Sequence, residues 1–150
     1  MEQIPSIACD IVRELTKDGL KDALLDEGFR PKEGANDWVN FKREGKNYSA
    51  RCFKEDPTML VVMAPRVYEI TENDDRLALL ETLNRLNADI CVGKLYIHKD
   101  AVWVTVEVRH RRIGSVPNLL SSYIDDIDRC VSAFSSEYKQ PEETPTPAVH

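Results

Sequence analysis

The feature that most constrains the fold is a change of hydrophobic period in the stretch "LNRLNADICVGKLYIHKDAVWVTVEVRH", which begins at Leu83. Leucines first recur at helical spacing, and apolar and polar residues then alternate. Alternation places every second side chain on one face of a strand, so residues 94–98 and 101–110 predict two strands. Lys99 and Asp100 would join them as a two-residue turn, which makes the pair an antiparallel hairpin.

The two faces of this predicted hairpin differ in composition. On one face Leu95 opposes Val104 among apolar or small neighbours, so a one-residue slip would expose the whole set. On the other face Tyr96 opposes Trp103, where a solvent-facing side would normally be polar. The register also predicts the pairs Ile97 with Val102, Gly93 with Val106, Lys94 with Thr105 and Val92 with Glu107.

A second hairpin is predicted around the turn Glu44-Gly45, in the stretch "DWVNFKREGKNYSARCF". If the turn has two residues, Trp38 lies opposite Arg51 on one face, where the pair can form a cation–π contact. The other face would carry Val39, Phe41, Tyr48, Ala50 and Cys52.

The next segment, Met59 to Ala64, is apolar on both faces, which a solvated edge strand would not be. Its second side must therefore be covered by another part of the chain or by another molecule. We expect Pro65 to end this strand.

Three segments have helical patterns. Thr16 is a suitable N-cap for the first, which would stop at Gly28. Thr71 with Asp74 suggests a capping box for the second, and apolar residues recur every three or four positions along 116–138. In the second helix Leu79, Leu83, Leu86 and Ile90 form the expected core stripe, which Leu77 and Leu80 widen.

The predicted fold class is therefore α+β, an antiparallel sheet with the order α-β-β-β-α-β-β-α and helices mainly on one face. We predict a single domain over residues 15–138, preceded by an N-terminal segment 1–14. The proline-rich end 139–150 predicts a disordered tail.

This order resembles the fold of type III secretion chaperones, and the chain resembles the bacterial YbjN-like family of sensory transduction regulators. The resemblance lies in "LTKDGLKDALLDEGF", "LLETLNRLNADICVGKLYIHKDAVWVTVEV" and "LLSSYIDDIDRCVSAF". It implies a small cytosolic protein, often dimeric, without an agreed enzymatic activity. Its secretion-chaperone relatives bind extended segments of partner proteins, a function that a shared fold alone does not transfer.

Composition limits the classes of function. The net charge of −6 argues against a general nucleic-acid binder, and no run of residues is long and apolar enough for a membrane span. The N-terminus lacks the basic region of a secretory signal, so we expect a cytoplasmic protein. The four cysteines have no metal-ligand spacing and are expected to be small buried hydrophobes: Cys9, Cys52, Cys91 and Cys130.

The sequence contains no constellation that predicts catalysis, so we predict a non-enzyme without metal or cofactor. His98 and His110 lack a spaced carboxylate that would orient them. Asp125 and Asp128 lie three residues apart and indicate a solvated helix face more than a metal site. No glycine-rich phosphate loop is present.

Two surfaces remain as candidate sites. The basic cluster of Arg109, Arg111 and Arg112 could bind a phosphate, an acidic peptide or a small-molecule ligand. The stronger candidate is an aromatic sheet face that binds a protein partner or a second copy of the chain, unless a further helix of the same chain covers it. Its predicted members are Trp38, Met59, Val61, Met63, Tyr96 and Trp103.

Overall fold

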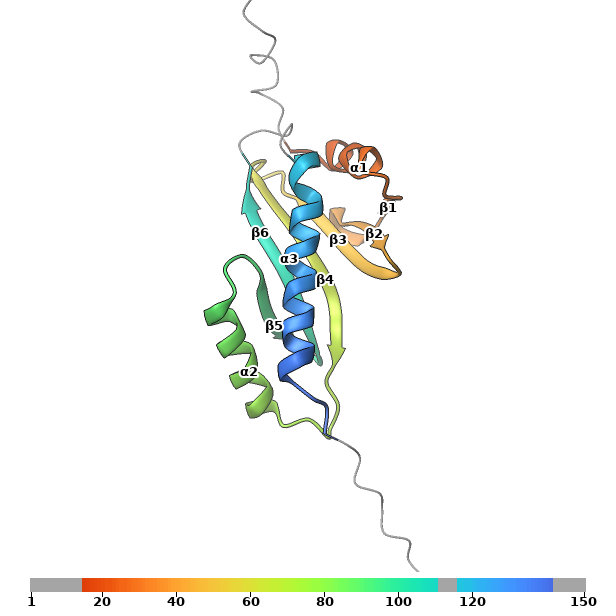
Figure 1. Ribbon diagram of the computed structural model, residues 1–150. Helices are drawn as coiled ribbons and strands as arrows, with labels where there is room; N and C mark the ends of the chain where they lie inside the picture. The colour runs from red at the N-terminus through yellow and green to blue at the C-terminus, as the bar shows by residue number, and fades with distance from the viewer. Residues whose placement is uncertain (1–14, 111–115, 142–150) are drawn as a thin grey trace, which may run out of the picture.

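The computed structural model describes residues 15–110 and 116–141 (Figure 1). The predicted segment 1–14 and residues 142–150 of the predicted tail lie outside the described residues. None of the helices within the described ranges has the length and hydrophobicity that crossing a membrane requires. The elements are α1 (Lys17–Asp26), β1 (Lys32–Glu33), the 3-10 helix η3 (Ala35–Asp37), β2 (Val39–Arg43), β3 (Lys46–Cys52), β4 (Met59–Glu69), α2 (Arg76–Asp89), β5 (Lys94–His98), β6 (Ala101–Arg109) and α3 (Val116–Glu137).

The described residues form one six-stranded antiparallel sheet with the order β1-β2-β3-β4-β6-β5. The predicted α+β class and the order of its main elements are confirmed. The structure adds β1, which pairs with the start of β2. Because β1 has only two residues, both exposed, the sequence contains no alternating pattern that could reveal it.

Both predicted hairpins have the predicted register. Tyr96 pairs with Trp103 across β5 and β6. In the other hairpin the turn residues Glu44 and Gly45 have φ values of 51° and 76°, the left-handed backbone that a tight two-residue turn requires. The predicted pairs of Val92 and Gly93 were wrong, because β5 begins only at Lys94.

The prediction that Pro65 ends its strand was also wrong, since β4 continues to Glu69. The register shifts at this point: Ala64 pairs with Val104, whereas the next paired residue is Tyr68. The bulge takes Pro65 out of the ladder, so its missing N–H costs no strand hydrogen bond.

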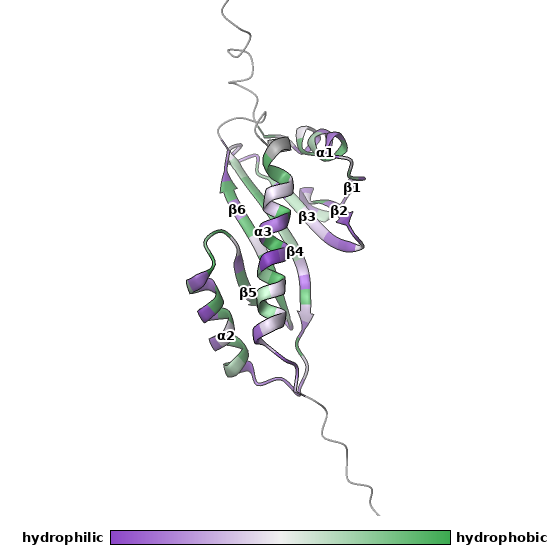
Figure 2. Cartoon of the chain, in the orientation of Figure 1, coloured by the Kyte–Doolittle hydropathy of each residue, from purple (hydrophilic) through white to green (hydrophobic). Residues whose placement is uncertain are grey.

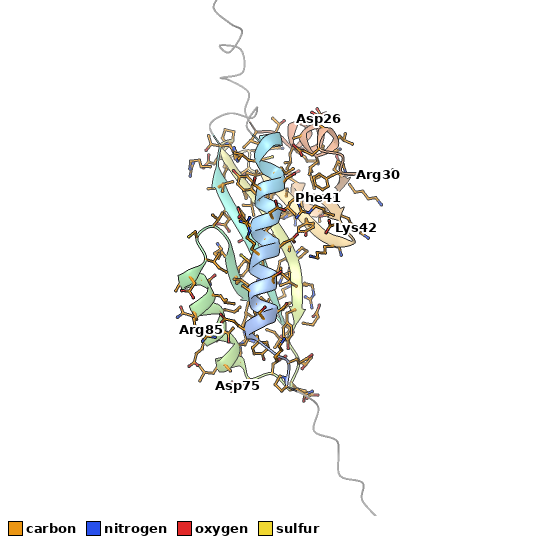
Figure 3. The ribbon with its side chains drawn as sticks, in the orientation of Figure 1. Asp26, Arg30, Phe41, Lys42, Asp75 and Arg85 are labelled. Carbon is orange, nitrogen blue, oxygen red and sulfur yellow. The ribbon has the colours of Figure 1, made fainter. Side chains whose placement is uncertain are left out.

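The helices lie on one face of the sheet, with α1 and α3 across it and α2 beside β5 (Figure 1). Figure 2 shows that β6 is mainly hydrophobic, whereas the β2–β3 hairpin carries several hydrophilic residues. Neighbouring residues alternate between the faces: Phe41 is buried and Lys42 is exposed (Figure 3). The covered face, as we call the helix side, carries Val39, Phe41, Tyr48, Ala50, Leu60, Val62, Leu95, Val102, Val104 and Val106.

The first two helices begin at acceptor side chains. Thr16 caps α1 as predicted, since its hydroxyl accepts from the N–H of Gly19 at 3.0 Å. The predicted cap at Thr71 was wrong: α2 begins after Asp75, whose carboxylate accepts from two backbone N–H groups of its first turn (Figure 3). Asp74 instead holds the preceding loop by accepting from the N–H of Thr71 at 2.8 Å.

The junction of α2 and β5 explains two residues of the motif that the resemblance rests on. The side-chain amide of Asn87 bonds both backbone groups of Leu95, at 2.8 and 2.9 Å. A Cβ at Gly93 would lie 2.2 Å from the Sγ of Cys130 on α3, so only glycine fits this approach. Along α2 the predicted core leucines are buried, but Leu77 and Leu80 are exposed and do not widen the stripe as predicted.

Candidate functional site

The side of the sheet opposite the helices gathers the predicted aromatic surface. No helix in the described part of the chain lies over this side, which we call the uncovered face. The register of the strands assigns Met59, Val61, Met63, Tyr96 and Trp103 to it, and the contact with Arg51 places Trp38, which precedes β2, on the same face. All are partly buried except Val61, which is buried.

Residues paired across neighbouring strands form rows on the uncovered face. Val61 lies in the middle of one row, opposite Arg51 on β3 and Glu107 on β6. Met63 lies in the middle of the next row, between Ser49 and Thr105. The β strands therefore supply an apolar centre with polar and aromatic groups on both sides of it.

Aromatic rings flank these rows at both sides of the sheet. The predicted cation–π contact is confirmed, since the Arg51 guanidinium lies 5.9 Å from the Trp38 ring centre. On the other side the His98 ring meets Trp103 edge-on at 5.5 Å, and the Lys94 ammonium lies 5.7 Å from the Tyr96 ring.

Three buried side-chain polar atoms have no hydrogen-bond partner within the described residues, and all belong to the uncovered face. They are Nε of Arg51, Nε1 of Trp103 and Oγ1 of Thr105. Thr105 is only 2% exposed. A buried polar group without a partner costs about 1–3 kcal/mol, so such groups are normally paired. Their concentration on one face is the feature that sequence reasoning missed.

The charged side chains of β5 and β6 on the uncovered face are already paired. Lys94 donates to Glu107 at 2.8 Å. Arg109, predicted as an anion ligand, donates to Asp56 at 2.7 Å and to Thr58 at 2.9 Å. The other two predicted anion ligands, Arg111 and Arg112, lie outside the described residues.

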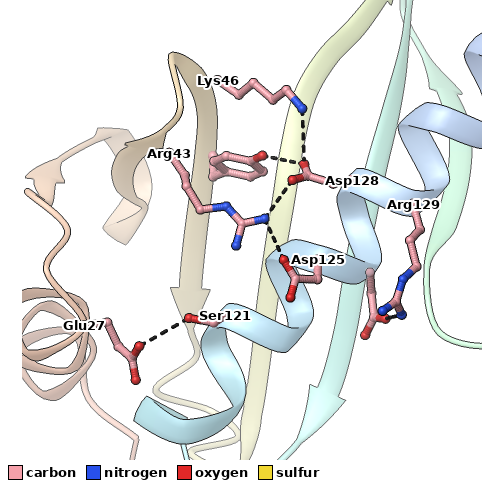
Figure 4. A network of polar contacts seen from close by, with 9 residues as sticks. Glu27, Arg43, Lys46, Ser121, Asp125, Asp128 and Arg129 are labelled. Carbon is pink, nitrogen blue, oxygen red and sulfur yellow. Dashed lines mark hydrogen bonds and ion pairs between the residues drawn. The ribbon is translucent and has the colours of Figure 1, made fainter.

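Polar groups on the covered face are connected across elements (Figure 4). Asp128 on α3 accepts from Tyr48 at 2.5 Å and from Arg43 at 2.7 Å, while Arg43 also donates to Asp125 at 2.8 Å. Burial disfavours the charged form of Asp128, but these hydrogen bonds outweigh it and hold its pKa below the ordinary value. The prediction of a solvated helix face was therefore wrong for Asp128, whose side chain is 24% exposed.

A second carboxylate, that of Asp74, accepts hydrogen bonds from two tyrosines near the C-terminal end of α3. Asp74 accepts from Tyr68 at 2.6 Å and from Tyr138 at 2.5 Å. Burial opposes its ionisation, yet the hydrogen bonds from the Thr71 N–H and the two tyrosines lower its pKa. Burial and the hydrogen bond to Asp74 raise the pKa of Tyr138 to about 12.

The histidines and cysteines within residues 15–110 and 116–141 do not form a cluster. His110 is buried against Tyr123, with 2.8 Å between Nε2 and the hydroxyl, and burial lowers its pKa. His98 is the exposed last residue of β5. Cys130 is buried as predicted, but Cys91 is exposed, which contradicts its prediction. No group of three potential metal-ligating side chains occurs within the described ranges.

A hollow of about 690 Å³ lies at the β2–β3 hairpin, and Arg109 is not among the residues that line it. Exposed Arg30, Lys32 and Lys42 contribute to its wall. Residues from both sides of the hairpin line it, including neighbours such as Phe41 and Lys42, so it is an open surface depression around the hairpin and not an enclosed site.

Comparison with known proteins assigns the family. No curated protein matches the chain. Residues 30–140 match the family model described as "T3SS (YopN, CesT) and YbjN peptide-binding chaperone 1". This match covers most of the chain and includes every described strand, so the predicted resemblance is confirmed. The chain belongs to the TY-Chap1 family of type III secretion and YbjN peptide-binding chaperones.

Proposed function

We propose that this protein is a non-catalytic chaperone or regulator that binds a segment of a partner protein on its uncovered face. The observation that carries the proposal is a sheet face that no described helix covers and that presents partly exposed aromatic and methionine side chains: Trp38, Met59, Met63, Tyr96 and Trp103. A bound polypeptide segment would cover these side chains with its own, and its carbonyl oxygens and N–H groups would meet the polar groups that flank them.

The composition of the face supports the same function. Trp and Tyr supply large contact areas that also carry a polar atom, and both are enriched in protein interfaces. Met59 and Met63 have unbranched side chains that can adapt to different partner surfaces. Val61 and Met63 at the centre are surrounded by polar groups, an arrangement that matches the apolar core and polar rim of an interface.

Several sequence-based predictions remain predictions. A homodimer through the same face is one, since a single patch can satisfy itself across a two-fold axis. A cytoplasmic location is another. The alternative function, a phosphate or small-ligand site at Arg109–Arg112, receives no support from Arg109, because Asp56 already occupies its guanidinium.

The chain contains a built-in reporter for a test. Both of its tryptophans belong to the uncovered face, so their fluorescence responds when this face is occupied. Phage-displayed random peptides are selected on the full chain, and synthetic copies of the enriched peptides are then titrated. We expect saturable emission changes, and binding weakened by about tenfold or more in Trp103→Ala.

Leu77→Ala is the matched control, since it removes an exposed apolar side chain from α2, on the helix side of the molecule. It should bind the peptides like the wild type. If no peptide is enriched, or if Trp103→Ala binds the peptides with unchanged affinity, the proposal is wrong. Sedimentation at micromolar concentrations separately tests the homodimer, which would appear at twice the chain mass of 17.1 kDa.

A further inference from the structure

Arg51 differs from the charged residues near it on the uncovered face. These are Glu107, in the same cross-strand row, and Arg109, in the row of Met59. Glu107 and Arg109 both have partners of opposite charge. The side chain of Arg51 makes no hydrogen bond or ion pair with any residue in the described ranges, and its Nε is buried. A partly buried guanidinium without an anion is unusual, because losing water is costly unless a partner replaces it.

The position of the guanidinium is fixed by aromatic rings. Its Cζ lies 4.7 Å from the ring centre of Phe53 and 5.9 Å from that of Trp38. Contacts with aromatic rings restrain a guanidinium while its N–H groups remain able to donate. Arg51 is therefore held in place before any anion arrives, which lowers the entropy lost on binding.

Two acids of this region have other partners. Glu107, in the same row beyond Val61, accepts from Lys94 at 2.8 Å. Asp37, which precedes Trp38, lies 3.7 Å from the ammonium of Lys17. These interactions leave the positive charge of Arg51 uncompensated on a face that we propose to bind polypeptide.

We infer that Arg51 binds the carboxylate of an Asp or Glu side chain in the partner segment. This inference rests on the proposed function and names a chemical requirement of the segment. In an extended segment, alternate residues point to one side at a spacing of about 7 Å. In a segment that follows β3, the residue two positions from the acid would then lie at Ser49, beside Met63 in the neighbouring row, and should be apolar to contact Met63.

The charge of the whole protein limits what this contact can do. With a net charge of −6 the chain repels acidic segments at long range. The contact with Arg51 therefore acts at short range and selects a sequence, without accelerating the encounter.

The test repeats the peptide selection on the wild type, on Arg51→Gln and on Arg109→Gln. Arg109→Gln is the matched control, because it removes an arginine that already has a carboxylate partner. We expect an Asp or Glu at one fixed position in peptides selected by the wild type and by Arg109→Gln. Peptides selected by Arg51→Gln should lack that preference.

Synthetic peptides quantify the contact. Replacing the selected acid by its amide should weaken wild-type binding by about tenfold and leave binding to Arg51→Gln unchanged. Higher salt should weaken only the pair that contains both charges.

The outcomes separate this inference from the proposed function. Peptides that bind the uncovered face without any acidic preference overturn the role of Arg51 and leave the function standing. Failure to select any peptide overturns the function itself. Equal loss of acidic preference in Arg109→Gln overturns the inference in favour of a general effect of charge, and dimerisation abolished by Arg51→Gln would assign the face to a second copy of the chain.

Discussion

The two faces of the sheet are built from alternate residues of the same strands, yet they treat polar groups in opposite ways. On the covered face the Tyr48 hydroxyl donates to Asp128 of α3. On the uncovered face the indole N–H of Trp103 and the hydroxyl of Thr105 are buried and have no partner among the residues that the structure describes. The comparison shows that apolar residues on a sheet face do not by themselves indicate that the face is buried in the core of its own chain. The pairing of polar atoms separates the face completed by its own chain from the face that we propose another chain completes.

The largest expected difference between the faces concerns packing on β4. Leu60→Ala, on the covered face, should lower the free energy of unfolding by about 2–5 kcal/mol, because it opens a cavity at a fully buried site. Met63→Ala, three residues away on the uncovered face, should cost less than about 1.5 kcal/mol, since Met63 is only partly buried. Urea unfolding measures both. Equal losses would mean that the uncovered face is packed within the isolated chain.

A smaller effect is expected from the carboxylate that joins α3 to the β2–β3 hairpin. Asp128→Asn should lower the free energy of unfolding by about 1.5–3 kcal/mol at neutral pH, because it weakens charged hydrogen bonds from Tyr48 and Arg43.

The pH dependence of this effect has a definite sign. The pKa of Asp128 is lowered in the fold, so its contribution is present above the unfolded value of about 3.9 and is lost as the pH falls through the folded value. The gap between wild type and Asp128→Asn in unfolding titrations should therefore be constant above about pH 5 and should shrink in acid. A gap that widens in acid would contradict this assignment.

The smallest effect is the sharpest test, because the two faces should respond with opposite signs. Tyr48→Phe removes a paired hydroxyl and should lower the free energy of unfolding by about 1 kcal/mol. Thr105→Val removes a buried hydroxyl without a partner and should raise it by up to about 1 kcal/mol. Thermal unfolding of both variants at one pH gives the comparison. Destabilisation by Thr105→Val would show that its hydroxyl is satisfied after all.

Much of the fold was predictable because it depends on neighbours in the sequence. The pairing of Tyr96 with Trp103 followed from the alternation of the two strands together with a two-residue turn between them. The bulge at Pro65 was not predictable, because it depends on how β4 matches β6, a strand about 40 residues further along the chain. Thr71 and Asp75 are both residue types that cap helices well, so the sequence does not distinguish them. In the structure Asp75 caps α2.

The candidate site was predictable only in part. Alternation predicted which aromatic residues share a face, and the structure places them on the side away from the helices. The missing partner of Arg51 could not be predicted, since nearby acids such as Asp56 and Glu107 offered plausible partners. Only the three-dimensional arrangement shows that Arg109 and Lys94 occupy those acids.

The amide of Asn87 has a consequence for how molecules of this protein meet one another. β5 is the last strand at its end of the sheet, and such edges are templates on which a foreign strand can pair and aggregates can grow. By bonding both backbone groups of Leu95, Asn87 stands in for the missing neighbour. An incoming strand would have to displace that side chain before it could form backbone hydrogen bonds with Leu95. We therefore expect this one residue of α2 to hinder polymerisation through the β5 edge of the sheet.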